Sequence, residues 1–256
     1  MTETTWYSEG AFCWTECATT DDQASADFYT AVFGWEQDAQ ALPVGGRYIT
    51  FRRNGKSVAA TNVQQEQEKA QGIPPHWNVY ISVDDVDRVA KEAEQAGGTI
   101  LAPPFDVMEL GRMAVIQDPT GGAVSLWQAK EMAGAEVYVE PNTTAWYELM
   151  SPDPQRAVRF FQDLFGYEVR ETTTLSGPYW VLRHKDENAA GIYNPQDLPP
   201  SWTPYFQAED ADAVVAKVEQ AGGTVMMPAT DIPDIGRVAW FSDPQGAVFA
   251  IIQPPA

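Results

Sequence analysis

The sequence has few of the residues from which metal and redox centres are usually built. It holds two cysteines and two histidines in 256 residues. Cys13 and Cys17 lie four positions apart in a predicted strand, which separates them by about 13 Å, too far for a disulfide. We expect two small buried side chains that face a helix, with neither a redox pair nor a zinc site.

Basic residues and long apolar runs are also scarce. Lysine and arginine total 16 against 36 aspartates and glutamates, which gives a formal net charge of −20. Nucleic acid and anionic membranes would be repelled by such a surface, so neither is expected as a partner. The sequence shows no run of about 18 apolar residues and no recognisable signal peptide. A cytoplasmic location is therefore expected.

What the sequence does contain is an internal repeat. The stretch "PPHWNVYISVDDVDRVAKEAEQAGGTI" returns 125 positions later as "PPSWTPYFQAEDADAVVAKVEQAGGTV", and "GRMAVIQDPTGGAVSLWQ" returns as "GRVAWFSDPQGAVFAIIQ". Such self-similarity indicates two homologous halves. We place the first domain at residues 8–129, a linker at 130–142 and the second domain at 143–255.

Each half divides again into two units of one strand, one helix and further strands. The units span about 12–62, 76–128, 144–194 and 201–253. Capping residues and terminal glycines predict one helix in each unit. These helices are expected at about residues 23–33, 86–96, 154–165 and 211–221.

Three motifs then carry a family resemblance. They are "FYTAVFGWE" and "FFQDLFGYE" at the end of each first helix, "DDVDRVAKEAEQAGG" in the second, and a "DPTGG" or "DPQGA" turn before the last strand. This combination resembles the vicinal oxygen chelate superfamily, which includes glyoxalase I, extradiol dioxygenases and bleomycin resistance proteins. More narrowly it is similar to two-domain glyoxalase-like proteins of actinobacteria. The resemblance implies an α+β fold of tandem domains, each with two βαβββ units that form a curved mixed sheet around a cavity.

Metal-using members of that superfamily hold the ion with side chains from the first strand of each unit and from the last strand. The residues at the matching positions are Trp14, Asn78 and Ser125 in the first half and Trp146, Thr203 and Ala250 in the second. None of them is a usual ligand for iron, zinc or manganese. His76 and His184 fall outside this register, and a set of Glu16 with His76 lacks a third ligand. We therefore predict no metal and no other cofactor.

Strand alternation predicts which side chains face each cavity. Phe12, Trp14 and Glu16 are expected inward on the opening strand. The candidate ligand-binding residues are Trp14, His76, Asn78, Tyr80, Ser125, Trp127, Trp146, Thr203 and Tyr205. This mixture of aromatic faces and polar groups suits a planar or aromatic organic ligand. The second cavity is expected to be plainer, since Ala250 and Ile252 replace Ser125 and Trp127.

Glu16 and Glu148 are the candidate catalytic residues. A carboxyl group among indole rings is partly desolvated, which raises its pKa toward the range of a general acid or base. The alternative is a structural ion pair with an arginine. The candidate partners are Arg52, Arg112, Arg183 and Arg237.

Two functions of different class remain open. One is a metal-independent enzyme of the isomerase, cyclase or lyase type that uses glutamate acid–base chemistry on a small organic metabolite. The other is a non-catalytic binding protein of the antibiotic-resistance type. A metal-dependent glyoxalase or dioxygenase is the least supported. The tandem halves allow a monomer by pairing within the chain, with a homodimer as the alternative.

Overall fold

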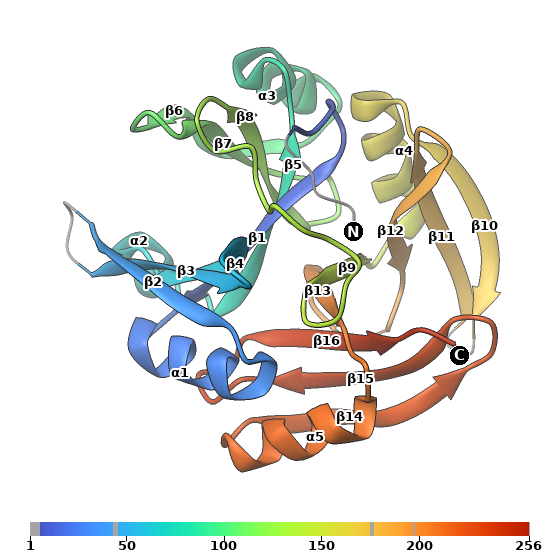
Figure 1. Ribbon diagram of the computed structural model, residues 1–256. Coiled ribbons are helices and arrows are strands. Elements are labelled where there is room, and N and C mark those ends of the chain that lie inside the picture. Colours follow the sequence, from blue (N-terminus) through green and yellow to red (C-terminus); the bar gives the residue numbers. More distant parts are fainter. Residues whose placement is uncertain (1–5, 43–45, 175–176, 197, 256) are drawn as a thin grey trace.

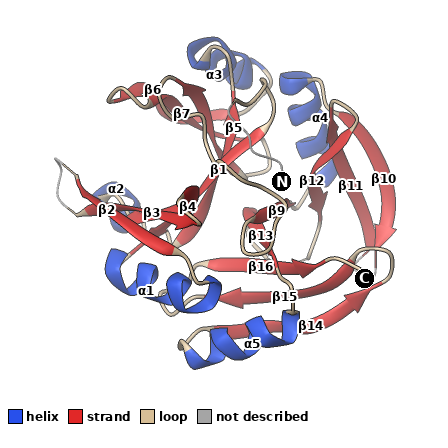
Figure 2. Cartoon of the chain, in the orientation of Figure 1, coloured by secondary structure: helices blue, strands red, loops and turns tan. Residues whose placement is uncertain are grey.

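The chain forms two eight-stranded mixed sheets, one from each half (Figure 1). We describe a computed structural model that covers residues 6–42, 46–174, 177–196 and 198–255. Helices lie on one face of each sheet, as Figure 2 shows. This is the predicted α+β fold with two copies of one domain plan.

The first sheet has the strand order β2-β3-β4-β1-β5-β8-β7-β6. Its strands are β1 (Phe12–Thr19), β2 (Glu36–Ala41), β3 (Arg47–Arg53), β4 (Lys56–Val63), β5 (His76–Ser82), β6 (Thr99–Val107), β7 (Gly111–Gln117) and β8 (Ala123–Ala129). Its helices are α1 (Asp22–Phe33), α2 (Glu66–Ala70) and α3 (Val86–Gln95). The short α2 was not predicted.

The second sheet repeats this order as β10-β11-β12-β9-β13-β16-β15-β14. Its strands are β9 (Thr144–Met150), β10 (Glu168–Thr174), β11 (Gly177–His184), β12 (Glu187–Tyr193), β13 (Ser201–Gln207), β14 (Thr224–Ile232), β15 (Gly236–Ser242) and β16 (Val248–Gln253). Its helices are α4 (Pro154–Phe165) and α5 (Ala211–Gln220).

The predicted capping residues set the helix boundaries. The side chain of Asp21 accepts a hydrogen bond from the Ala24 amide, and Gly34 ends α1 in the left-handed region at φ 72°. In the second half, Asp153 caps α4 in the same way and Gly166 ends it at φ 67°. Local sequence therefore places both helices to within about one residue.

The main apolar cores lie between the two halves and pair their units crosswise. One core joins α3 and the back of β5 to α4, while the other joins α1 to α5 and the back of β16. Figure 1 shows α3 beside α4 and α1 beside α5. Trp77 and Trp202 lie in these cores, as the alternation predicted.

A β-bulge between Phe12 and Trp14 reverses two of the predicted orientations. Phe12 packs into the core between the halves, where its ring stacks on Tyr147 at 4.8 Å, instead of facing the cavity. Cys13 joins the opposite face beside Trp14, whereas Cys17 faces the helix core as expected. Both cysteines are free and buried.

The two core interfaces differ at one hydroxyl group. In the first, the Tyr29 hydroxyl donates to Asp243 Oδ2 at 3.1 Å and accepts a hydrogen bond from the Trp77 indole at 3.0 Å. The repeat places Phe161 where Tyr29 stands, beside Trp202 at a centroid distance of 5.5 Å. Asp118 Oδ2 and Trp202 Nε1 have no hydrogen-bond partner among the described residues. One missing hydroxyl thus accounts for two unpaired polar atoms.

No helix among the described residues is both long enough and apolar enough to cross a membrane.

Phe161→Tyr is expected to stabilise the protein. The new hydroxyl would supply a donor to Asp118 and an acceptor to Trp202, and pairing buried polar atoms contributes about 1 kcal/mol or more. Thermal unfolding should show a Tm about 2–4 °C higher for each kcal/mol gained. Tyr29→Phe should lower the Tm.

Phe160→Tyr is the matched control, because it adds a hydroxyl to a neighbouring ring that is buried in an apolar core. Its Tm should fall. A Phe161→Tyr protein no more stable than the parent would show that the two unpaired atoms lie out of reach of the hydroxyl.

Candidate functional site

A half-buried carboxylate, that of Glu16, lies on the first concave face. Strands β1 and β5 pair Trp14 with Tyr80 and Glu16 with Asn78, so these side chains share one face. The Tyr48 hydroxyl donates to Glu16 Oε2 at 2.8 Å and the Tyr80 hydroxyl donates to Oε1 at 2.7 Å. The Trp14 indole donates to the Tyr48 hydroxyl at 3.0 Å. Phenols from β3 and β5 thus each bond one oxygen of the carboxylate on β1.

The second concave face repeats this cluster and adds to it. The Tyr179 hydroxyl donates to Glu148 Oε1 at 2.6 Å, and Tyr205 donates a short hydrogen bond to Oε2. Trp146 donates to Tyr179 at 3.1 Å, as Trp14 does to Tyr48. A second indole, that of Trp240 on β15, donates to the Tyr205 hydroxyl at 2.8 Å.

Burial raises the pKa of both glutamates. Desolvation is the largest effect on the pKa of Glu16, and hydrogen bonds from Tyr80, Tyr48 and Asn62 act in the opposite direction. The pKa of Glu148 is raised by desolvation as well, against the bonds from Tyr179 and Tyr205. Each carboxyl group therefore holds its proton at a higher pH than a glutamate in water does.

The ion-pair alternative for these glutamates is wrong. Within the described ranges, all four candidate arginines pair with other carboxylates. Arg52 pairs with Asp38, Arg112 with Asp87, Arg183 with Glu168 and Arg237 with Asp212. Because phenols and not cations surround Glu16 and Glu148, their charge has no neutralising partner.

The side chains at the superfamily's ligand positions do not fit a metal ion. Trp14 offers no lone pair to a metal, and Asn78 and Ser125 are weak ligands for iron, zinc or manganese. Among the described residues, no three histidine, cysteine, aspartate or glutamate side chains gather into a possible metal set. His76 lies at the start of β5 with Nδ1 2.9 Å from the Pro74 carbonyl, and the His184 ring is hydrogen-bonded to the Ser8 hydroxyl at 3.0 Å.

The remaining predicted residues divide by accessibility. On the first face, Trp14, Ser125 and Trp127 are at most 5% exposed, whereas Asn78 and Glu16 are partly exposed. The Trp127 indole donates to the carbonyl of Met132, in the linker, at 2.8 Å. On the second face, Thr203 is buried beside Glu148, while Trp146 is partly exposed.

Several residues on the two faces were not predicted, among them Tyr48, Tyr179 and Trp240. Tyr48 and Tyr179 occupy equivalent positions in "GRYITFR" and "GPYWVLR", so aligning this stretch of the repeat would have found both. Trp240 stands where the first half has Val115, and the repeat gave no signal for it. The second face is therefore less plain than expected, because Trp240 supplies an indole that Ile252 does not.

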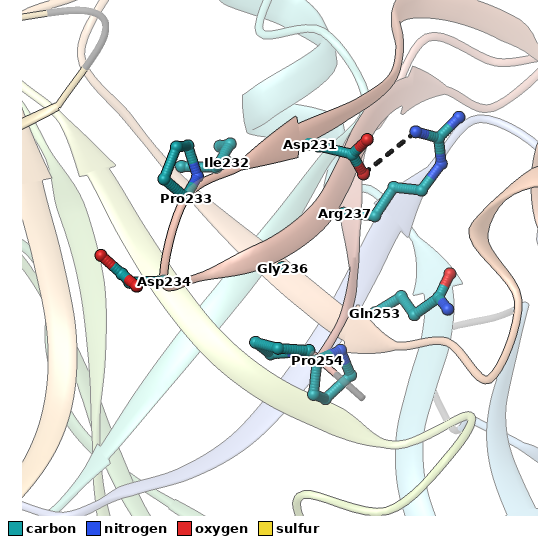
Figure 3. A pocket seen from close by; sticks show the side chains of 9 residues that line it. Asp231, Ile232, Pro233, Asp234, Gly236, Arg237, Gln253 and Pro254 are labelled. Carbon is teal, nitrogen blue, oxygen red and sulfur yellow. Dashed lines mark hydrogen bonds and ion pairs between the residues drawn. The ribbon is translucent and has the colours of Figure 1, made fainter.

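A surface cavity lies at one end of the second face (Figure 3). It has a volume of about 370 Å³ between the β14–β15 hairpin and the C-terminal residues. Ile232, Pro233, Gly236 and Pro254 form its apolar wall, and Arg237 lies at its side, bonded to Asp231 at 3.1 Å. A smaller cavity of about 140 Å³ lies between Trp6, Tyr7 and the end of β8.

Comparison with known proteins agrees with this architecture. A family model described as "Glyoxalase/Bleomycin resistance protein/Dioxygenase superfamily" matches residues 12–126 and again 143–251. A putative glyoxylase, CFP32, of Mycobacterium tuberculosis is 40% identical over 97% of this chain and 96% of its own length. The anthracycline biosynthesis protein DnrV of Streptomyces peucetius is 35% identical over 96% of this chain and 94% of its own.

Solved structures support the same fold. A Mn(II)-bound glyoxalase from Novosphingobium aromaticivorans superposes with a TM-score of 0.68 at 17% identity, over 96% of this chain and 82% of that one. The 2,3-dioxygenase LapB from Pseudomonas sp. KL28 superposes with a TM-score of 0.67 at 14% identity, over 97% and 94%. At such identities the likeness concerns the fold alone.

Glu148→Gln is expected to flatten one part of the pH dependence of stability. Because burial raises the pKa of Glu148 above its ordinary 4.5, ionisation is harder in the folded than in the unfolded chain. The carboxyl's contribution is fully present at low pH and is lost as the pH rises through the folded pKa. The free energy of unfolding of the variant, relative to the parent, should therefore increase as the pH rises above the ordinary glutamate pKa of 4.5.

Urea unfolding at several pH values measures this difference. Glu171→Gln is the matched control for the loss of a carboxyl group, since Glu171 is exposed on an edge strand. If the free energy of unfolding of Glu148→Gln and that of the parent changed equally with pH, a raised pKa of Glu148 would be contradicted.

Proposed function

Since the chain belongs to the glyoxalase/bleomycin resistance protein/dioxygenase superfamily, we propose that it is an enzyme acting on a small planar organic molecule without a metal ion. The observation that carries the proposal is the glutamate of each concave face. Glu148 is buried and Glu16 is half-buried, each receives two phenol hydrogen bonds, and neither faces a cation within the described residues. Such a carboxyl is suited to move a proton.

The chemistry of this cluster is acid–base catalysis. An ionised glutamate accepts a proton from an acidic C–H or O–H of the substrate, and the resulting carboxylic acid returns it to another atom of the same molecule. This is an isomerisation, in which no electrons or atoms are gained or lost. Cyclisation and elimination use the same two transfers. The raised pKa brings the carboxyl closer to the operating pH, where such exchange is most efficient.

The tyrosines and tryptophans would hold the carboxyl in place. Tyr48 and Tyr80 each bond one oxygen of Glu16, which fixes the plane of the carboxylate, and the Trp14 indole fixes the phenol of Tyr48. Loss of either phenol is expected to leave the glutamate less well oriented. These are positioning residues in the proposal, whereas the glutamate that contacts the substrate is the catalytic residue.

A planar aromatic compound is the proposed substrate class. Indole and phenol rings line both faces, and aromatic ligands pack well against them. Two relatives that cover nearly the whole chain are named for anthracycline biosynthesis, which concerns planar polycyclic compounds. A net charge of −20 disfavours an anionic ligand.

A non-catalytic binding protein is the second candidate. Its support is that every hydroxyl of the Glu16 cluster already has a partner, so the cluster is complete without a substrate. A buried network that is fully bonded also serves to make one face rigid. Such a face would hold a planar compound without transforming it.

Anthrone, a planar ketone with an acidic C–H, provides a direct test. The enzyme is expected to accelerate deuterium uptake from D₂O at that carbon beyond the rate in buffer of equal pD, as followed by NMR. The Glu16→Gln, Glu148→Gln double variant should still bind anthrone in equilibrium dialysis but lose at least about tenfold of the acceleration.

The control is protein treated with a chelator and then supplied with iron, zinc or manganese. Equal rates before and after would agree with acid–base chemistry by the glutamates. Binding without acceleration in the parent protein would favour the binding function. Acceleration that required a metal would overturn the proposal.

A further inference from the structure

The two concave faces differ in how far their aromatic rings are accessible to solvent. We infer that only the second face binds a planar aromatic ligand. The inference rests on the proposed function for the ligand class. It goes beyond that function by assigning the site to Trp146 and Trp240 on the second face, with entry beside the cavity at the β14–β15 hairpin. The first face, in this assignment, is closed by the chain itself.

The linker between the halves covers the aromatic part of the first face. The Ala135 amide donates to the Cys13 carbonyl at 2.8 Å, and Trp127 donates to the Met132 carbonyl at 2.8 Å. The Tyr7 hydroxyl donates to the Ala135 carbonyl at 2.5 Å. Trp14 and Trp127 are left only 3% and 5% exposed, whereas Trp146, the equivalent of Trp14, is partly exposed. A ligand could reach the two rings of the first face only if the linker moved.

The second face has no such cover among the described residues. Trp146, Tyr179, Tyr193 and Trp240 on this face are all partly exposed, as are the neighbouring apolar side chains Met227 and Ile252. Four aromatic rings with accessible surface lie on one sheet around Glu148. An uncovered aromatic surface of this kind is typical of a ligand-binding site.

The large cavity joins this face at its edge. Ile232, like Trp146, Trp240 and Ile252, packs against the cluster of Tyr205, Val238 and Ala250, and it also forms part of the cavity wall. In the first half the equivalent hairpin is occupied, because the amides of Lys130 and Met132 donate to the Leu110 carbonyl. The linker that covers the aromatic part of the first face therefore also occupies the position beside the β6–β7 hairpin. The equivalent position beside the β14–β15 hairpin is the cavity.

The polar groups on the second face indicate a ligand with a hydroxyl donor. A carboxylate has about four acceptor positions, and two of those on Glu148 are used by Tyr179 and Tyr205. A phenolic hydroxyl on the ligand would take a third. Planar hydroxylated aromatic compounds without charge fit these requirements.

Titration of the protein with 1,8-dihydroxyanthraquinone, followed by its visible absorbance, tests the inference. We expect one molecule bound per chain. Trp240→Ala should weaken binding about tenfold, the loss expected for one stacking indole. Val115→Ala, at the equivalent position of the first half, is the matched control and should bind as the parent does.

Hydrogen exchange of the parent protein gives a second test that needs no variant to fold. Bound dihydroxyanthraquinone should slow amide exchange in residues 224–253 and leave residues 99–129 unchanged. Slowed exchange in 99–129 alone, two molecules bound per chain, or no binding by the parent would each overturn the inference.

The outcomes also separate this inference from the proposed reaction. Binding confined to the second face, with no acceleration of deuterium uptake, would sustain the site and refute the catalysis. Acceleration that is lost on Glu16→Gln alone, with binding at the first face, would sustain the catalysis and refute the site.

Discussion

The concave side of each sheet is organised around one buried carboxylate. Taking a glutamate out of water is costly unless its oxygens are hydrogen-bonded, and here each oxygen receives a phenol from a different strand. Glu16 therefore ties β1 to β3 and β5 through Tyr48 and Tyr80. Because no cation among the described residues shares the site, burial leaves the carboxyl with a raised pKa although the phenols bond to it.

Duplication then allowed the two halves to diverge around a common plan. The glutamate, its two tyrosines and one tryptophan are present in both. The hydroxyl of Tyr29 completes one interface while Phe161 leaves the other with two unpaired polar atoms. Trp240 adds an indole to the second face, while the linker covers the aromatic part of the first. Equivalent positions thus acquired different roles in packing and in access.

Much of the fold followed from local patterns, because capping residues and strand alternation act over a few residues. The helices end where Gly34 and Gly166 allow the left-handed turn, and Trp14, Glu16 and Tyr80 share one face as their parity required. The orientation of Phe12 could not be predicted, since the bulge between Phe12 and Trp14 breaks the alternation of inward and outward side chains along β1. Of the four phenol partners, Tyr80 and Tyr205 were among the predicted face residues, whereas Tyr48 and Tyr179 were not, because they come from β3 and β11, which lie far in sequence from the glutamates.

The sequence by itself determined the family, the two halves, the concave side chains and the poor fit to a metal ion. These depend on residue identity and spacing, which the repeat displays twice. Only the tertiary structure decided what surrounds Glu16 and Glu148, and which face is open. Phenols instead of arginines contact the carboxylates because the sheet brings distant strands together. The linker covers one face because it must cross from the end of β8 to the start of β9, and no periodicity in the sequence records that path.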